Sequence, residues 1–139
     1  MTKAKSKPAR KPRLLITTKD LEILTTMVGA APTTAGAILL ADELDRAMVV
    51  NEGFNARAFC RIGSWVTYED LQSGQTREIQ LVLPADADID KQRVSALSLV
   101  GASLVGLTPG AAFSWTDEKG RPHRLKVLDV ANAHEPHVH

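Results

Sequence analysis

The sequence predicts an α+β fold, in which a short antiparallel helical hairpin precedes a mostly antiparallel sheet with one short helix. Two early segments carry apolar residues at helical spacing and are joined by a short loop that contains glycine and proline. From residue 65 onward, apolar and polar residues alternate in segments that are separated by turn-forming residues. A length of 139 residues suits one domain, or one domain with a small appendage.

The first helix is expected to begin at Thr17 or Thr18, because either hydroxyl can cap its first turn. The loop at residues 29–32 ends it. Its apolar stripe consists of Leu21, Leu24 and Val28.

The second helix is expected from a cap at Thr33 or Thr34 to about Val50, with an apolar stripe of Leu40, Leu44 and Ala47. Residues 14–53 then form the helical hairpin. Late in this helix, Asp42 and Arg46 are spaced to pair on a solvated face, and the alternative is an acidic patch for a partner.

The first strand is expected over residues 65–70, and residues 72–75 form the turn after it. In the next strand Ile79, Leu81 and Leu83 alternate with polar residues, and a proline closes the strand. Residues 94–97 fit a further short strand.

A short helix is expected over residues 100–106, capped by Ser98 and ended by Gly106. Residues 107–110 have the composition of a turn. Gly106 and Gly110 flank that turn, where a positive φ or a close backbone approach would require glycine.

The last two strands are expected on either side of a turn at residues 117–120. Phe113 and Trp115 share one face of the first of them, and residues 125–130 form the returning strand. His123 lies close to the turn and has no obvious partner in the sequence.

The net charge of +1 conceals a strong asymmetry along the chain. Residues 14–139 hold 11 basic and 16 acidic residues, whereas residues 1–13 hold six basic residues and no acidic one. We expect residues 1–13 to be a disordered tail, either solubilising or in weak electrostatic contact with nucleic acid. Its cations are Lys3, Lys5, Lys7, Arg10, Lys11 and Arg13.

Composition excludes several classes of protein. No apolar run reaches the length of a membrane span, and no apolar signal core follows the N-terminus, so a cytoplasmic protein without a membrane partner is expected. One cysteine cannot build a disulfide framework. Aromatic residues make up only 4% of the chain, which argues against a surface that stacks nucleic-acid bases.

No motif predicts a catalytic, cofactor or metal site. Asp86, Asp88 and Asp90 resemble the start of a calcium loop, but the glycine and glutamate that complete an EF-hand are missing, so a solvated acidic loop is expected. Cys60 lacks a nucleophile signature and is expected in the core. The histidines of the polar tail at 132–139 could bind a transition metal, but a frayed tail is favoured.

Three stretches, at residues 40–47, 62–68 and 94–110, together resemble the regulator of nucleoside diphosphate kinase family of bacteria, short relatives of the Gre transcript-cleavage factors. The resemblance spans residues 14–131. It implies an N-terminal coiled-coil finger, an FKBP-like C-terminal domain at residues 54–131, and binding of RNA polymerase at its secondary channel. The residues that it assigns to polymerase binding are Ser98, Leu99, Val100 and Gly101.

The sequence departs from the family pattern at three places. In the cleavage factors, acidic residues at the finger tip hold a catalytic Mg²⁺ of the polymerase, whereas residues 28–34 here contain no carboxylate. Leu99 stands where the family has proline, and Ala111 where it usually has aspartate. The expected tip consists of Gly29, Ala30, Ala31, Pro32 and Thr33.

The resemblance and the acid-free tip lead us to expect a non-catalytic regulator that binds RNA polymerase and needs no cofactor. A peptidyl-prolyl isomerase-like enzyme is one alternative, because the implied fold is FKBP-like. A nucleic-acid-associated module that uses the basic tail is another.

Overall fold

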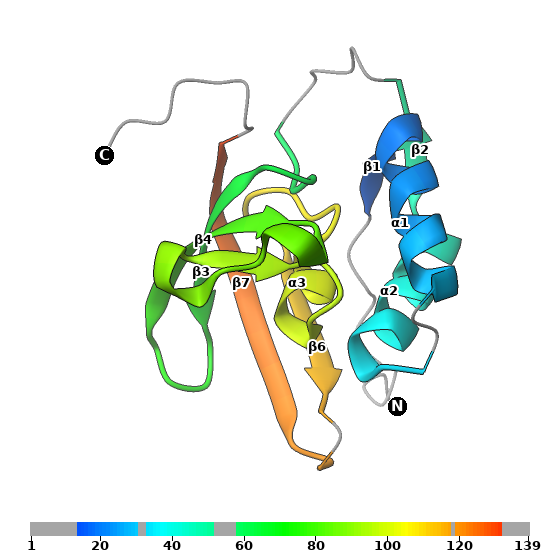
Figure 1. Ribbon diagram of the computed structural model, residues 1–139. Helices are drawn as coiled ribbons and strands as arrows, with labels where there is room; N and C mark the ends of the chain where they lie inside the picture. Colours follow the sequence, from blue (N-terminus) through cyan, green and yellow to red (C-terminus); the bar gives the residue numbers. More distant parts are fainter. Residues whose placement is uncertain (1–13, 31–32, 52–57, 118, 132–139) are drawn as a thin grey trace, which may run out of the picture.

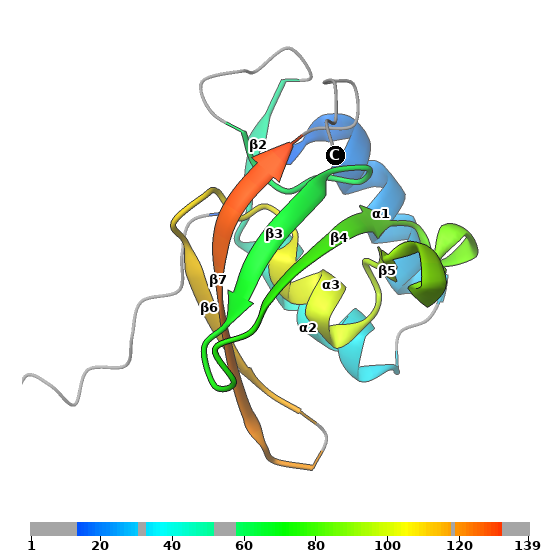
Figure 2. The same ribbon diagram turned by 90° about the vertical axis from the view of Figure 1, so that its left-hand side faces the viewer.

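The computed structural model describes residues 14–30, 33–51, 58–117 and 119–131. The protein has a mixed α/β architecture in which a curled sheet carries the helices on one of its faces (Figures 1 and 2). Within these ranges, no helix has both the length and the apolar character needed to cross a bilayer.

The main sheet has five strands in the order β5-β4-β3-β7-β6. All neighbouring pairs are antiparallel except β4 and β5, which are parallel, so the expectation of a mostly antiparallel sheet is confirmed. The two 3-10 turns Pro84–Asp86 and Ile89–Lys91 connect β4 to β5. The strands are β3 (Trp65–Asp70), β4 (Thr76–Val82), β5 (Arg93–Ser95), β6 (Ala112–Thr116) and β7 (Pro122–Ala131).

Side-chain hydroxyls cap the three α-helices of the described ranges, which are α1 (Thr18–Ala30), α2 (Ala35–Asp45) and α3 (Leu99–Leu104). Thr17 Oγ1 accepts the Asp20 N–H at 3.1 Å, and Thr34 Oγ1 accepts the Ala37 N–H at 3.1 Å. Ser98 Oγ accepts the Gly101 N–H at 3.0 Å. The structure thus selects Thr17 and Thr34 from the two pairs of expected caps and confirms Ser98.

The second helix is shorter than expected. It ends at Asp45 instead of Val50, and the following residues form strand β2 (Met48–Val50), which pairs in parallel with β1 (Leu15–Thr17). β-branched valines favour strand over helix, and the Met48 N–H gains the Leu14 carbonyl as its acceptor at 2.8 Å.

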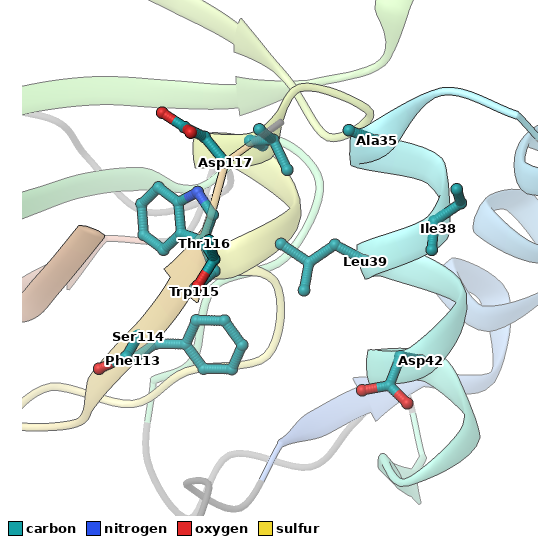
Figure 3. A pocket seen from close by; sticks show the side chains of 10 residues that line it. Ala35, Ile38, Leu39, Asp42, Phe113, Ser114, Trp115, Thr116 and Asp117 are labelled. Atoms are coloured by element: carbon teal, nitrogen blue, oxygen red, sulfur yellow. The ribbon is translucent and has the colours of Figure 1, made fainter. Parts of the chain in front are cut away.

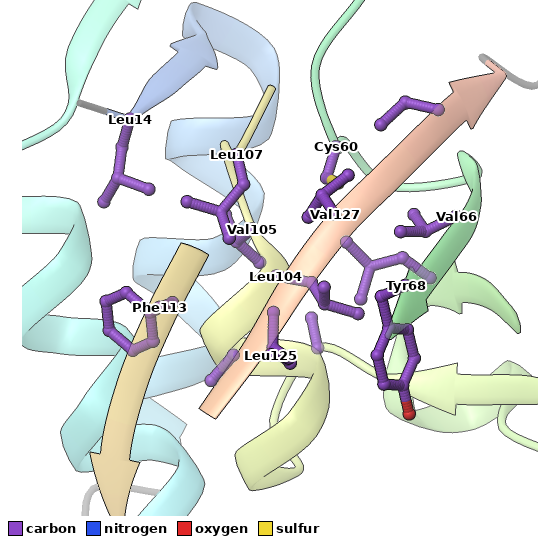
Figure 4. Close-up of a cluster of buried hydrophobic side chains, with 14 of the residues drawn as sticks. Leu14, Cys60, Val66, Tyr68, Leu104, Val105, Leu107, Phe113, Leu125 and Val127 are labelled. Carbon is purple, nitrogen blue, oxygen red and sulfur yellow. The ribbon is translucent and has the colours of Figure 1, made fainter. Parts of the chain in front are cut away.

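The helices and the sheet share one apolar core (Figure 4). Leu14, Leu24 and Leu40 from the N-terminal half belong to the same buried cluster as Val66, Leu81, Leu104, Leu107, Phe113, Leu125 and Val127. Cys60 lies in this cluster with 1% of its surface exposed, as expected of a core cysteine.

Two glycines allow this close packing. A Cβ at Gly36 of α2 would overlap the Leu97 carbonyl oxygen, and a Cβ at Gly101 of α3 would overlap the Ser95 carbonyl oxygen. Because neither overlap involves a flexible side chain, α2 and α3 reach their positions only with glycine at these two sites.

Two acidic residues, Asp20 and Glu43, lie inside the protein. Asp20 is 5% exposed and accepts the Ile62 N–H at 3.1 Å, which joins α1 to the segment before β3. Glu43 is fully buried and binds Arg46 Nη2 at 2.8 Å. The expectation of a solvated face at residues 42–46 is therefore wrong for Glu43, because a buried carboxylate requires a close cation. The expected pairing of Asp42 with Arg46 stays a prediction.

Candidate functional site

A groove of about 520 Å³ lies between α2 and β6 (Figure 3). Its walls are mostly apolar, and a carboxylate lies toward either end of it. Its lining residues are Ala35, Ile38, Leu39, Asp42, Leu99, Phe113, Ser114, Trp115, Thr116 and Asp117.

One wall is formed by α2. Spacings of three and four along the helix place Ala35, Ile38, Leu39 and Asp42 on the same side of it. Ile38 is 59% exposed, which is high for a large aliphatic side chain. The start of this wall lies next to the corner that begins α3, because Gly36 packs against the backbone of Leu97 and Ser98.

The other wall is formed by β6. Phe113 is 2% exposed and forms part of the floor, and Trp115 lies on the same face of the strand. The Trp115 ring stacks on the ring of His123, which is directly opposite on β7, with 5.1 Å between the ring centroids and 14° between the planes.

Asp117 completes this wall by holding the end of the β6–β7 hairpin. Its Oδ1 accepts the Lys119 and Arg121 N–H groups at 2.9 Å each, and its Oδ2 lies 2.9 Å from His123 Nε2. The bond to His123, followed by the backbone bonds, lowers the pKa of Asp117 to about 2. The carboxylate at this end of the groove is therefore ionised at neutral pH.

The four residues that the resemblance assigns to polymerase binding lie at the start of α3 but face different surroundings. Ser98 caps the helix, and Leu99 lines the groove. Val100 lines a small cavity of about 50 Å³ behind Trp115 and His123. Gly101 is buried against Ser95, so its role in the described structure is to let α3 pack.

The two turn glycines have positive φ angles, +83° at Gly106 and +92° at Gly110. Gly106 also lies close to β1, because a Cβ there would be 2.9 Å from the Leu15 carbonyl oxygen. Gly110 has open space around it, so conformation alone accounts for glycine at that position.

Part of the expected site lies outside the described residues. Gly29 and Ala30 end α1, and Thr33 is exposed before α2, but Ala31 and Pro32 of the tip are not described. The same holds for the six cations of residues 1–13 and for the C-terminal histidines.

A metal-binding cluster and a reactive thiol are two kinds of group that could support catalysis. The described ranges contain no group of three or more histidine, cysteine or acidic residues placed to hold a metal ion. Burial raises the pKa of the Cys60 thiol, which keeps it protonated and unsuited to act as a nucleophile.

Sequence reasoning missed the wall built by Trp115, His123 and Asp117, and its statement that His123 has no obvious partner is wrong. A signal was available in the hairpin. Counting outward from a turn at residues 117–120 puts Trp115 opposite Pro122, one residue from the observed partner His123, so the hairpin pattern brings the two rings close without fixing their register.

Comparisons with known proteins agree on one family. The family model described as "Transcription elongation factor, GreA/GreB, C-term" matches residues 57–132. The GreA transcription elongation factor of Thermotoga neapolitana is 34% identical over 71 residues, which cover 51% of this chain and 45% of that protein. The chain therefore spans about half the length of that relative.

Two further similarities extend through the N-terminal half. The regulator of nucleoside diphosphate kinase of Escherichia coli K12 is 29% identical over 123 residues, which cover 86% of this chain and 90% of that protein. A solved GreA/GreB transcription elongation factor from Nitrosomonas europaea matches with a TM-score of 0.68 and 28% identity, covering 86% of this chain and 98% of the other. Since the family model matches more than half of the chain, this protein belongs to the GreA/GreB C-terminal family of transcription elongation factors.

Proposed function

We propose that this chain is a non-catalytic regulator that binds RNA polymerase near the secondary channel and modulates elongation without stimulating transcript cleavage. Membership of the GreA/GreB family carries the first part of the proposal. The match to the nucleoside diphosphate kinase regulator over most of both chains supports a short form of the family.

The finger of this proposal is the pair of helices α1 and α2, and the FKBP-like domain at residues 54–131 grips the rim of the channel. The absence of a carboxylate from residues 28–34 supports the lack of cleavage activity, because a second catalytic Mg²⁺ needs acidic ligands. The shared core of helices and sheet supports a finger that stays close to the domain.

Competition for core RNA polymerase tests binding. A labelled Gre factor is bound to the polymerase, and the full chain is titrated against it; displacement is expected. Leu99→Ser should weaken displacement by about tenfold or more, since Leu99 lines the groove next to the Ser98 corner. Ile89→Ser is the matched control, because Ile89 is 82% exposed on a turn that does not line the groove. No binding and no displacement would refute the proposal.

Backtracked elongation complexes test the second part. Added protein should leave the transcript intact while a Gre factor cleaves it, and rapid cleavage would contradict the argument from the tip. A proline-peptide isomerisation assay should likewise give no rate enhancement.

The basic tail is proposed as an auxiliary contact with nucleic acid beside the polymerase. Deleting residues 1–13 should then weaken binding at low salt far more than at high salt. Equal weakening at both salt concentrations would rule out an electrostatic role.

A further inference from the structure

Strand β6 is an edge of the five-stranded sheet, and its pairing with β7 determines which backbone groups face outward. The Val127 N–H donates to the Ala111 carbonyl, and the Asp117 N–H donates to the Arg121 carbonyl, each at 2.9 Å. Antiparallel pairs alternate between residues that exchange hydrogen bonds and residues that do not. With bonded positions at 111 and 117, the residues whose N–H and C=O groups point away from β7 are Ala112, Ser114 and Thr116.

Within the described residues, several features that usually prevent further pairing are missing from β6. Residues 112–116 contain no charge and no proline, and their register with β7 is continuous. The opposite edge differs. Strand β5 has only three residues, and Arg93 already exchanges backbone hydrogen bonds with Asp88, at 3.0 and 2.9 Å.

The groove lies along this open edge. Five consecutive residues, 113–117, line it. Side chains alternate between the two faces of a strand, so a cavity that contacts consecutive residues must run along the backbone at the strand's edge. Figure 3 shows α2 on the far side, with Ala35 near the Asp117 end and Asp42 toward the Phe113 end. An extended segment between them would have hydrogen-bonding groups along one side and the Ile38 and Leu39 side chains beside it.

The charges of the groove favour a basic occupant. Its lining includes two carboxylates, Asp42 and Asp117, and no lysine, arginine or histidine. The hydrogen bonds that lower the pKa of Asp117 keep that charge in place at neutral pH.

We propose that β6 accepts an added strand from a partner protein: an extended segment of about five residues, apolar on the face that meets α2 and with lysine or arginine at its ends. The backbone of Ala112, Ser114 and Thr116 supplies the hydrogen bonds, and the groove selects the side chains. This inference goes beyond the proposed function, because it requires no polymerase and is tested without one.

Amide hydrogen exchange of the full ¹⁵N-labelled chain tests the proposal, with the synthetic peptide acetyl-KVTVTVK-amide as ligand. The amides of Ala112, Ser114 and Thr116 should exchange at least tenfold more slowly with saturating peptide. Those of Phe113 and Trp115 should not change, since β7 already binds them. Uniform protection along β6, or none, would overturn the proposal.

Two altered peptides separate backbone pairing from apolar contact. In the first, alternate backbone nitrogens are methylated on the edge that would pair, and this peptide should no longer protect the three amides of β6. The second, acetyl-EVTVTVE-amide, should bind at least tenfold more weakly, because its charges are reversed. Equal binding of all three peptides would contradict strand addition. The three amides could also become protected without peptide as the protein concentration rises. That result would mean that a second copy of the chain is the occupant, and it would also overturn the proposal.

A pair of variants makes the same distinction within the protein. Ser114→Pro removes one outward N–H without removing a bond to β7, whereas Ser114→Ala keeps that N–H. Peptide affinity should fall about tenfold or more in Ser114→Pro and stay within twofold in Ser114→Ala; equal affinity would count against the proposal. If Ser114→Pro does not fold, the methylated peptide decides the question with the unaltered chain.

Discussion

The indole of Trp115 and the imidazole of His123 stack across the β6–β7 hairpin, with 14° between their planes. Asp117 holds the same imidazole from the side through Nε2. The position of a groove wall thus depends on a histidine that lines the small cavity behind it together with Tyr68, Asp70 and Arg124.

Replacing His123 by alanine should lower the free energy of unfolding by about 1 kcal/mol, because a stacked pair contributes about 0.5–1.5 kcal/mol beyond its burial. His123→Phe keeps an aromatic ring and should recover most of that loss. Urea denaturation measures both variants. In a Trp65→Phe background, which leaves Trp115 as the only tryptophan, His123→Ala should also shift the emission to longer wavelength. Equal stability of the two variants would contradict a role for stacking.

Stability below pH 4 should depend on Asp117. Its pKa is lowered to about 2 in the folded protein. The hydrogen bonds to its carboxylate therefore contribute their full stabilisation when the pH is above the ordinary aspartate pKa near 4. That contribution is lost as the pH falls through about 2. The melting temperature of Asp117→Asn, measured from pH 6 to pH 2, should therefore converge on that of the unaltered chain at the acid end. A constant difference over the whole range would show that ionisation of Asp117 does not matter.

Gly101→Ala should destabilise the fold by about 3 kcal/mol, since the new Cβ overlaps the backbone carbonyl of Ser95. Gly29→Ala is the matched control on another helix. Nothing lies within 4 Å of a Cβ there, so alanine should stabilise α1 by up to about 1 kcal/mol. Thermal and chemical denaturation measure both, and losses of equal size would disprove the close approach at Gly101.

Leu99→Pro should be tolerated, with a change in stability of less than about 1 kcal/mol. Leu99 is the first residue of α3, where proline is favoured, and Ser98 has the extended conformation that precedes proline, with ψ at 161°. Ala102→Pro should instead cost about 3 kcal/mol, because the Ala102 N–H donates to the Ser98 carbonyl at 2.8 Å. Denaturation curves test both. In the competition assay, Leu99→Pro should bind polymerase more tightly if the corner acts as the family resemblance implies.

Asp20→Ala should lower the free energy of unfolding by about 1–3 kcal/mol, since it leaves the partly buried Ile62 N–H without its acceptor. Asp20→Asn keeps an acceptor oxygen and should cost less than half as much. Comparable losses for the two would mean that the negative charge, rather than the hydrogen bond, joins α1 to the sheet.

Local patterns predicted most of the elements. The cap at Ser98 and the alternation in β3 and β4 are properties of neighbouring residues, so the sequence alone suffices to find them. For α1 and α2 the sequence narrows the cap to two adjacent threonines, and the hydrogen bonds of Thr17 and Thr34 decide between them. Pairing of β1 with β2 was missed because it depends on contacts between distant segments, and three-residue strands have too few residues for a periodic signal.

The candidate site was predicted less completely for the same reason. The Ser98–Leu99 corner was found through a family resemblance, and the structure places Leu99 in the groove. The burial of Glu43 and the position of Asp42 in that groove depend on which side of α2 meets the sheet. The expected stripe through Leu40 and Leu44 does place Glu43 next to the apolar side of α2, but a charged residue there is ordinarily assigned to solvent.

The hydrogen bond from the Leu15 N–H to the Gly106 carbonyl, at 3.0 Å, joins two segments that are made at different times. Strand β1 leaves the ribosome early, yet its partner at Gly106 is synthesised some 5–20 seconds later, at about 5–20 residues per second. During that interval the apolar side chains of β1, α1 and α2 have no sheet to cover them. The core can therefore be completed only after Gly106 has been made.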